Sequence, residues 1–199
     1  ASSLQYFVDF GDESSGRQPD CDQGVEMITI VDYGIGNTGS VAKMLQRVGA
    51  TSSISSDPDT IAQADALILP GVGAHEAAMG ELSKRDLLPA LHNAAIVRKV
   101  PILGICLGMQ LLVDGSDEGG APGLGWIPGW CQRLAPGDSL RVPQMGWNYL
   151  EVHQSHPFVK GTTDRSRFYF IHSYAVVCES AIDVVATCDY GEAITAFIS

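Results

Sequence analysis

The sequence predicts an α/β fold, in which a parallel or mixed sheet carries helices on both faces and continues into an antiparallel C-terminal extension. Between residues 27 and 112, short apolar runs alternate with helical periodicity, and such runs imply parallel strands joined by right-handed crossovers. After about residue 124, strand-like runs follow one another with turns and no helical stretch between them. With 199 residues, 45% of them hydrophobic, the chain is long enough for one domain with a core and too short for a second full one.

In the first half, the first apolar run covers residues 28–32 and predicts a strand. A helix then begins at Asn37 or Ser40 and ends at Gly49. Its expected inward face consists of Val41, Met44, Leu45 and Val48.

Further strands are expected at residues 51–55, 66–69 and 101–106, and Pro70-Gly71 is expected to end the second of them. A helix is predicted over residues 86–99. Its expected inward residues are Leu87, Leu88, Leu91 and Ala95. The expected strands of the second half cover residues 124–134, 148–152, 168–177, 183–187 and 193–198.

The charge balance is acidic, with 12 Lys and Arg against 23 Asp and Glu and a net charge of −11. A chain of this charge repels phosphates, so nucleic acid is not an expected partner. No window approaches 18 apolar residues and the N-terminus lacks a basic region before an apolar run, so neither a membrane span nor a secretory signal is predicted. Five cysteines without a C-x-x-C pair make a zinc site or a disulfide framework improbable, and they favour a reducing cytoplasm.

Residues 1–26 differ from the rest, with six acidic residues and one basic residue in a turn-rich stretch. We expect a disordered arm, or sequence translated upstream of the true start at Met27. The predicted domain covers residues 27–199.

The strongest chemical signal is Cys106, which lies between Gly104 and Gly108 directly after the apolar run 101–103. This spacing is typical of a nucleophile elbow, in which a strand turns sharply into a helix and the flanking glycines relieve the clash. A thiol at a helix N-terminus is expected to have a lowered pKa. The sequence therefore predicts that Cys106 is a nucleophile rather than a structural cysteine.

Acyl chemistry also needs donors for a developing oxyanion. Gly71, Val72 and Gly73 follow an earlier strand, so their loop is expected at the same edge of the sheet as Cys106. A base is harder to find, because none of the five histidines has a distinguishing context. These are His75, His92, His153, His156 and His172.

A second motif favours another class of protein. Gly34, Gly36 and Gly39 fit the G-x-G-x-x-G pattern after a strand, and Asp57 follows the second strand. The alternative is therefore a Rossmann-type dinucleotide-binding oxidoreductase. Hydride transfer does not require a cysteine elbow, so the presence of the elbow argues against an oxidoreductase.

The segments IVDYGIGNTGSV (30–41), LILPGVGAHEAAM (67–79), PILGICLGMQLL (101–112), VPQMGWN (142–148) and FYFIHSYAV (168–176) resemble, in this order, the HisH glutaminase subunits of imidazole glycerol phosphate synthase. That family belongs to the class I, triad-type glutamine amidotransferases, whose fold is flavodoxin-like. The resemblance covers residues 27–199. It implies a role in histidine biosynthesis, although a related surface-sugar pathway uses similar subunits.

The resemblance also implies site roles. Cys106 matches the nucleophile that attacks L-glutamine, and Gly71, Val72 and Gly73 match the oxyanion strand. The positions that match glutamine-binding residues are Gln110, His172, Ser173 and Tyr174. The positions that match the face toward the synthase subunit are Asn37, Trp147, Asn148 and Tyr169. That partner is a (β/α)8 barrel called HisF, which receives the released ammonia in a heterodimer; the resemblance implies neither a cofactor nor a metal.

One departure from the family is clear, because its triad is completed by a His-Pro-Glu stretch near the C-terminus and this sequence contains none. His156-Pro157-Phe158 precedes the 168–176 segment and so lies in the wrong place. We therefore expect a C-terminally truncated sequence without its general base, and an inactive chain as given. A non-catalytic pseudo-glutaminase that only binds the barrel is the remaining alternative.

Overall fold

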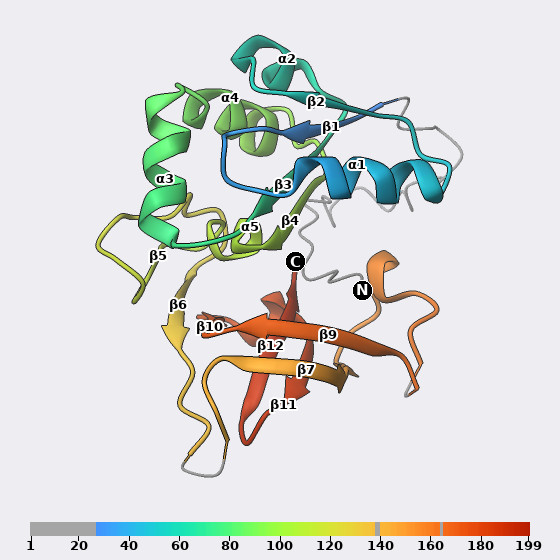
Figure 1. The fold of residues 1–199 in the computed structure, drawn as a ribbon, viewed down its shortest axis with the longest axis vertical. Coiled ribbons are helices and arrows are strands. Elements are labelled where there is room, and N and C mark those ends of the chain that lie inside the picture. Colours follow the sequence, from blue (N-terminus) through green and yellow to red (C-terminus); the bar gives the residue numbers. More distant parts are fainter. Residues whose placement is uncertain (1–26, 138–139, 164) are drawn as a thin grey trace.

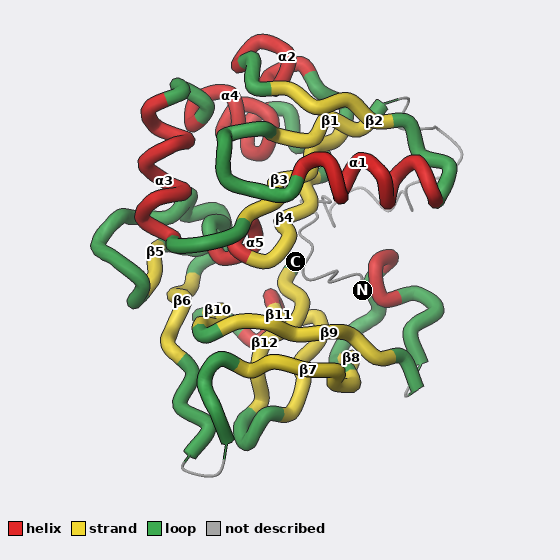
Figure 2. The backbone as a smooth tube through the Cα atoms, viewed as in Figure 1, coloured by secondary structure: helices red, strands yellow, loops and turns green. Residues whose placement is uncertain are grey.

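The computed structural model describes residues 27–137, 140–163 and 165–199. The arm predicted over residues 1–26 lies outside the described residues. Figures 1 and 2 show two parts: a sheet with helices in the upper half of the view, and a group of strands in the lower half.

The upper part is built on a four-stranded parallel sheet in the order β2-β1-β3-β4. Its strands are β1 (Ile28–Val31), β2 (Ser52–Ser55), β3 (Ala66–Gly71) and β4 (Ile102–Cys106). Within the described residues β4 is an edge strand of this sheet. The predicted alternation of strands and helices around a parallel sheet is confirmed.

The connecting helices are α1 (Thr38–Arg47), α2 (Pro58–Gln63), α3 (His75–Lys84), α4 (Leu88–His92) and α5 (Leu107–Gln110). A π-helical turn, Asn93–Val97, continues α4. In Figure 1, α1 lies on the opposite side of β1 and β2 from α2, as right-handed crossovers require. Among the residues described, every helix is too short or too polar to span a lipid bilayer.

The lower part contains three small sheets, and most of their pairs are antiparallel as predicted. β6 (Gly129–Arg133) pairs with β10 (Tyr174–Cys178) and, in parallel, with β5 (Gly115–Ser116). β7 (Gln144–Tyr149) pairs with β9 (Arg167–His172). β11 (Val184–Asp189) lies between β8 (Glu151–Val152) and β12 (Ala193–Ile198). Two short 3-10 helices cover Pro157–Val159 and Ala181–Asp183.

Two apolar cores meet at α5. Leu107 and Leu111 belong to the core of the parallel sheet, whereas Met109 belongs to the core of the lower strands. Leu124 and Trp126 pack against both cores. The short helix that follows Cys106 is therefore held from both sides.

Several expectations about element boundaries are wrong. Only Gly129–Arg133 of the strand expected over residues 124–134 is a strand, and residues 148–152 contain the end of β7 and the separate β8. β3 continues through Pro70 and Gly71, because it pairs there with β4 alone and one side of the strand needs no donor. The segment 168–177 forms two strands that break at Ser173. The helix predicted over 86–99 is shorter, and α3, which the apolar pattern did not indicate, precedes it.

The predicted inward face of α1 is also incorrect, since no residue of that helix is buried. Val48 is 73% exposed and Met44 is 36% exposed. The helix packs on β2 and β1, at the β2 edge of the sheet, so its apolar stripe meets only a narrow strip of sheet.

Candidate active site

Cys106 is the last residue of β4 and the N-cap of α5, with φ 57° and ψ −114°. A positive φ is unfavourable for a residue with a side chain, so the backbone is strained here. The strand, the sharp turn and the helix lie in the order that a nucleophile elbow requires.

Three glycines allow α5 to lie directly on the sheet. A Cβ on Gly108 would overlap the carbonyl oxygen of Leu69 in β3. A Cβ on Gly104 would lie 2.7 Å from the Met109 nitrogen, and one on Gly71 would lie 2.8 Å from the Gly108 nitrogen. Main chain therefore packs against main chain on both sides of the thiol.

The thiol lies in an environment that disfavours the thiolate. Burial raises the pKa of Cys106, and the negative charge of Glu118 raises it further, while the Leu107 N–H lowers it. The net shift is upward. The expectation of a lowered pKa is therefore wrong for this structure: α5 has only four residues, and burial outweighs its N-terminus.

The predicted oxyanion strand lies beside the thiol. Gly71 is the register partner of Cys106 in the parallel β3–β4 pair. Val72 is 55% exposed, and Gly73 has a φ of +93° with open space where a Cβ would be. The backbone after Gly71 therefore leaves the sheet next to Cys106 and is accessible to a ligand.

The residues predicted to bind glutamine are joined by hydrogen bonds. The Gln110 side-chain amide donates to the Tyr174 main-chain oxygen at 3.1 Å, and His172 Nδ1 donates to the same oxygen at 2.8 Å. His172 Nε2 lies 2.9 Å from the Gln144 side-chain oxygen. The Ser173 carbonyl accepts from Leu134 N. Residues 172–174 thus form a fixed wall that is tied to α5.

Two of the histidines considered as bases are buried. Burial lowers the pKa of His172, whose ring nitrogens both have close polar partners. His75 is 0% exposed at the start of α3, its pKa is lowered by burial, and neither ring nitrogen has a hydrogen-bond partner among the described residues.

The other three histidines are engaged elsewhere or exposed. His153 Nε2 bonds Thr187 Oγ1 at 2.8 Å, and His156 Nδ1 accepts from Phe158 N. His92 is exposed at the end of α4.

Glu118 is a site residue that the sequence did not single out. Its carboxylate accepts from the His75 main-chain N–H at 3.1 Å, and its charge acts on Cys106. It reaches the site from the loop after β5, 43 positions from His75. The only signal in the sequence was the acidic pair Asp117-Glu118 shortly after the elbow.

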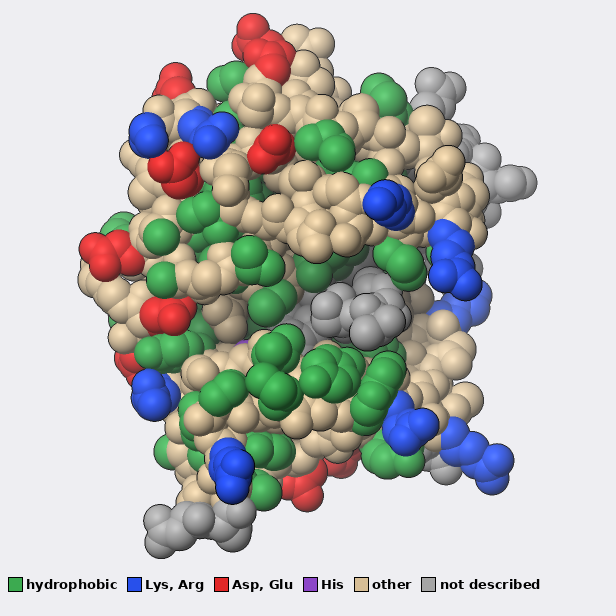
Figure 3. Space-filling model, viewed as in Figure 1, with side chains coloured by type: hydrophobic (Ala, Val, Ile, Leu, Met, Phe, Trp, Pro, Cys, Tyr) green, Lys and Arg blue, Asp and Glu red, His purple; other side chains and the backbone are tan. Residues whose placement is uncertain are grey.

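Exposed apolar side chains gather on one face of β7 and β9, and they form a green band across the lower half of Figure 3. We call this set, together with the half-buried Tyr169 on the same face, the β7–β9 patch: Met145, Trp147, Tyr149, Tyr169 and Ile171. Trp147 is 55% exposed and meets Tyr169 edge to face at 5.5 Å.

Of the four predicted interface residues, only Trp147 and Tyr169 belong to this patch. Asn148 lies on the opposite face of β7, and its amide donates to the Asp189 oxygen. Asn37 is the exposed N-cap of α1 and accepts from Ser40 N at 3.1 Å. Trp147 and Tyr169 are adjacent, whereas these two asparagines serve local structure.

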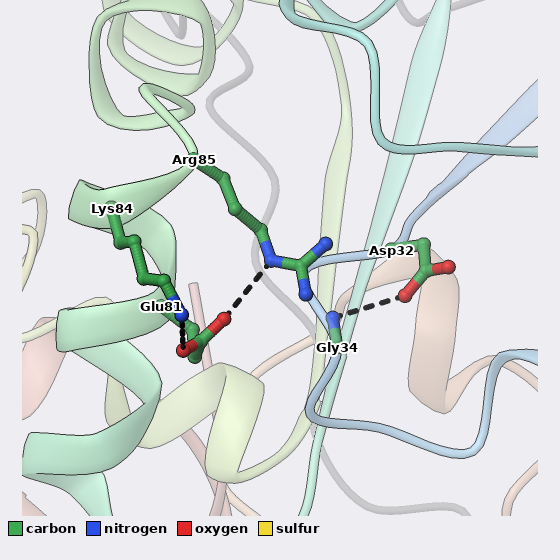
Figure 4. Close-up of polar contacts among 5 residues, drawn as sticks. All are labelled: Asp32, Gly34, Glu81, Lys84 and Arg85. Atoms are coloured by element: carbon green, nitrogen blue, oxygen red, sulfur yellow. Dashed lines mark hydrogen bonds and ion pairs between the residues drawn. The ribbon is translucent and has the colours of Figure 1, made fainter.

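The glycine motif of residues 34–39 does not form an open phosphate cradle. The Arg85 guanidinium occupies the space beside Gly34, whose N–H donates to Asp32 (Figure 4). Glu81 holds Arg85 at 3.1 Å. The Asp57 carboxylate caps α2 through Thr60. Gly34 and Asp57, which belong to the pattern of a dinucleotide site, therefore make hydrogen bonds within the fold.

A cysteine at a strand-to-helix turn, a glycine paired in register with it and a fixed polar wall, on a parallel sheet with an antiparallel extension, are the arrangement expected of a class I glutamine amidotransferase. The family model "Glutamine amidotransferase class-I" matches residues 29–199. The structure titled "Structure of PurLQS from Thermotoga maritima" shares the fold, with a TM-score of 0.62 and 20% identity over 87% of this chain and 78% of that one.

Relatives of higher sequence identity identify one family within this class. Imidazole glycerol phosphate synthase subunit HisH 2 of Pseudomonas aeruginosa is 43% identical over 173 residues, which are 87% of this chain and 86% of that protein. Subunit HisH of Streptococcus gordonii is 47% identical over 174 residues, which are 86% of this chain and 82% of that protein. The chain belongs to the HisH family.

Proposed function

We propose that the chain is the glutaminase subunit of imidazole glycerol phosphate synthase in histidine biosynthesis. It hydrolyses L-glutamine to glutamate and ammonia, and the ammonia passes to a HisF-type (β/α)8 subunit that forms imidazole glycerol phosphate and AICAR. The observation that carries this proposal is the register of Gly71 with Cys106, because it aligns a nucleophile with donors for an oxyanion.

Cys106 Sγ attacks the carboxamide carbon of glutamine in the proposed reaction. The main-chain N–H groups of residues 71–73 donate hydrogen bonds to the oxyanion. The amide nitrogen takes up the proton that the thiol lost and leaves as ammonia, and a γ-glutamyl thioester remains. Water then hydrolyses the thioester and releases glutamate. Because burial disfavours the thiolate, a base is required to form it efficiently.

We assign the general base to none of the residues 1–199, because these residues contain no His-Pro-Glu triplet. We propose that the polypeptide of these residues hydrolyses glutamine very slowly. Loss of the base from such a unit costs orders of magnitude in rate.

The amino-acid end of glutamine fits the wall beside α5. The backbone of residues 172–174 and the Gln110 amide offer donors and acceptors, and the Glu118 carboxylate offers a negative charge for the substrate ammonium group. The β7–β9 patch is the proposed contact with the barrel, because exposed aromatic side chains favour a protein interface. A reducing cytoplasm fits the four free cysteines of the described residues.

The test compares glutamate release by the wild-type chain, Cys106→Ala and Cys106→Ser, each with a partner barrel and each extended by a family His-Pro-Glu segment. The extended wild type is expected to be active and both variants inactive, with partner binding unchanged. Full activity of Cys106→Ala would overturn the role of Cys106. The same assay on residues 1–199 should give far slower turnover. Equal turnover with and without the segment would make His75 the first alternative base, because the ring nitrogens of His172 are engaged.

A further inference from the structure

Tyr33 has a buried hydroxyl that the reaction above does not use. The residue lies two positions after the end of β1 and is 1% exposed. Within residues 27–137, 140–163 and 165–199 its Oη has no hydrogen-bond partner. A buried hydroxyl without a partner costs free energy, so its presence calls for a use.

The hydroxyl lies between the oxyanion strand and the start of α5. A Cβ on Gly71 would be 2.8 Å from Tyr33 Oη, 2.8 Å from Leu107 Cβ and 2.8 Å from the Gly108 nitrogen. Gly71 is the register partner of Cys106, and Leu107 is the next residue after it. The hydroxyl is therefore at the buried side of the elbow.

The two groups also act on one another electrostatically. Burial raises the pKa of Tyr33 well above its usual value, and the charge of Cys106 raises it further. The phenol consequently keeps its proton at any pH at which the protein works. A protonated phenol beside an anion is a hydrogen-bond donor.

We propose that the Tyr33 hydroxyl is a positioning donor for the Cys106 thiolate. In the resting protein the thiol is neutral and the hydroxyl has no described partner. Cys106 Sγ is outside hydrogen-bond range of Oη in this structure. When the thiol proton leaves to the base or to water, the Cys106 side chain must therefore rotate toward the Tyr33 O–H, which then donates to the sulfur and stabilises its negative charge. Tyr33 keeps its proton throughout, and no bond to it forms or breaks. The donor offsets part of the burial that disfavours the thiolate.

This inference rests on the proposed nucleophilic role of Cys106, but its test needs no turnover. The rate at which iodoacetamide modifies Cys106 is measured against pH by mass spectrometry, for the wild type and for Tyr33→Phe. A lost hydrogen bond to a charged group predicts a midpoint about one pH unit higher and a rate about tenfold slower near neutral pH. The urea midpoint of Tyr33→Phe is expected to stay equal or to rise, because an unsatisfied hydroxyl has been removed.

Ser53→Ala is the matched control, because Ser53 in β2 has the other buried hydroxyl without a partner in the described chain. Its alkylation profile should superimpose on that of the wild type. Identical profiles for Tyr33→Phe and wild type would overturn the inference. So would a Tyr33→Phe profile whose change is matched by a lower urea midpoint, since the tyrosine would then be structural.

A second measurement keeps the inference testable if Tyr33→Phe folds poorly. Incorporation of fluorotyrosine makes phenols better donors and should lower the alkylation midpoint of Cys106 in the wild-type chain. An unchanged midpoint contradicts the inference. If Cys106→Ala keeps full glutaminase activity, the proposed function fails, whereas an unchanged alkylation profile removes only the role of Tyr33.

Discussion

The Gln110 side chain donates to the Tyr174 main-chain oxygen at 3.1 Å, which ties the helix after Cys106 to a strand 64 residues later. The same oxygen accepts from His172 Nδ1 at 2.8 Å. This hydrogen bond fixes the proposed substrate wall relative to α5. A substitution in either element is therefore expected to shift the other.

Replacing Gln110 by Glu tests this link. The variant loses the donor and places an acceptor against the Tyr174 oxygen, so we expect a loss of about 1–3 kcal/mol in the free energy of unfolding at neutral pH. Part of the loss should be recovered at low pH, where a protonated Glu can donate. Urea unfolding at two pH values measures both effects. Gln132→Glu, at an exposed position of β6, is the control and should change little. Equal stabilities of the two variants would contradict the prediction.

Gly108→Ala should destabilise the protein strongly, because its methyl group would overlap the Leu69 carbonyl oxygen. We expect a loss of about 3 kcal/mol or more, since backbone on both sides must move. The matched control is Gly80→Ala in α3, where nothing lies within 4 Å of the new methyl group. Because Ala favours a helix interior, this control should gain up to about 1 kcal/mol. Chemical unfolding of both variants gives the comparison, and a stable Gly108→Ala would refute the close packing.

Glu118→Gln should make the thiol more reactive. The Glu118 charge raises the pKa of Cys106, so its removal lowers that pKa and increases the thiolate fraction at any pH below it. The alkylation rate of Cys106 at about pH 7.5 should therefore rise. In an active complex the same variant should have a higher KM for glutamine, because the proposed partner of the substrate ammonium group loses its charge. Glu179→Gln, in the turn after β10, is the control. A slower alkylation rate in Glu118→Gln than in the wild type would show that the Glu118 charge does not raise the pKa of Cys106.

Trp147→Ala should weaken binding of the partner barrel. A half-exposed Trp in an aromatic patch is a typical interface hot spot, and its truncation costs about 2 kcal/mol, or roughly a thirtyfold increase in Kd. Titration calorimetry with the barrel measures this change. Ile182→Ala, outside the β7–β9 patch and 72% exposed, should bind like the wild type. If the two variants bind equally well, the patch is not the interface.

His75→Phe should reduce the pH dependence of stability. Burial lowers the pKa of His75 in the folded state, so between that value and about 6.5 the unfolded chain binds a proton that the folded chain does not. The free energy of unfolding of the wild type therefore falls as the pH drops below about 6.5. His75→Phe removes this contribution, whereas His92→Gln at an exposed position leaves it in place. Urea unfolding curves at about pH 5.5 and 7.5 measure the pH dependence of both variants. If the free energy of unfolding of His75→Phe changes between these pH values as much as that of the wild type, the prediction is wrong.

That residues 71–73 lie beside Cys106 could be predicted from the sequence, because the carboxyl ends of parallel strands meet at one edge of a sheet. The pairing of Gly71 with Cys106 confirms that part of the prediction. The strand over residues 193–198 also has the expected bounds. In both cases a local pattern and a general rule of sheets were sufficient.

The remaining site contacts depend on pairings between distant segments. Glu118 reaches His75 across 43 positions, and β7 pairs with β9 across a long connection. Nothing in the periodicity of either segment determines such partners. The opposite faces of Trp147 and Asn148 follow from strand alternation, but only after the register of β7 is known.

The direct packing of α5 on the sheet has a consequence for how this protein can vary. The separation between Cys106 and residues 71–73 depends on close backbone packing at Gly71, Gly104 and Gly108, where any Cβ would lie within 3 Å of main-chain atoms. Sequences that keep these glycines can exchange core residues of other helices, such as Leu82 in α3 or Ile61 in α2, without altering that packing. Substrate and partner preference can therefore diverge, by drift or by engineering, while the reacting geometry is inherited unchanged.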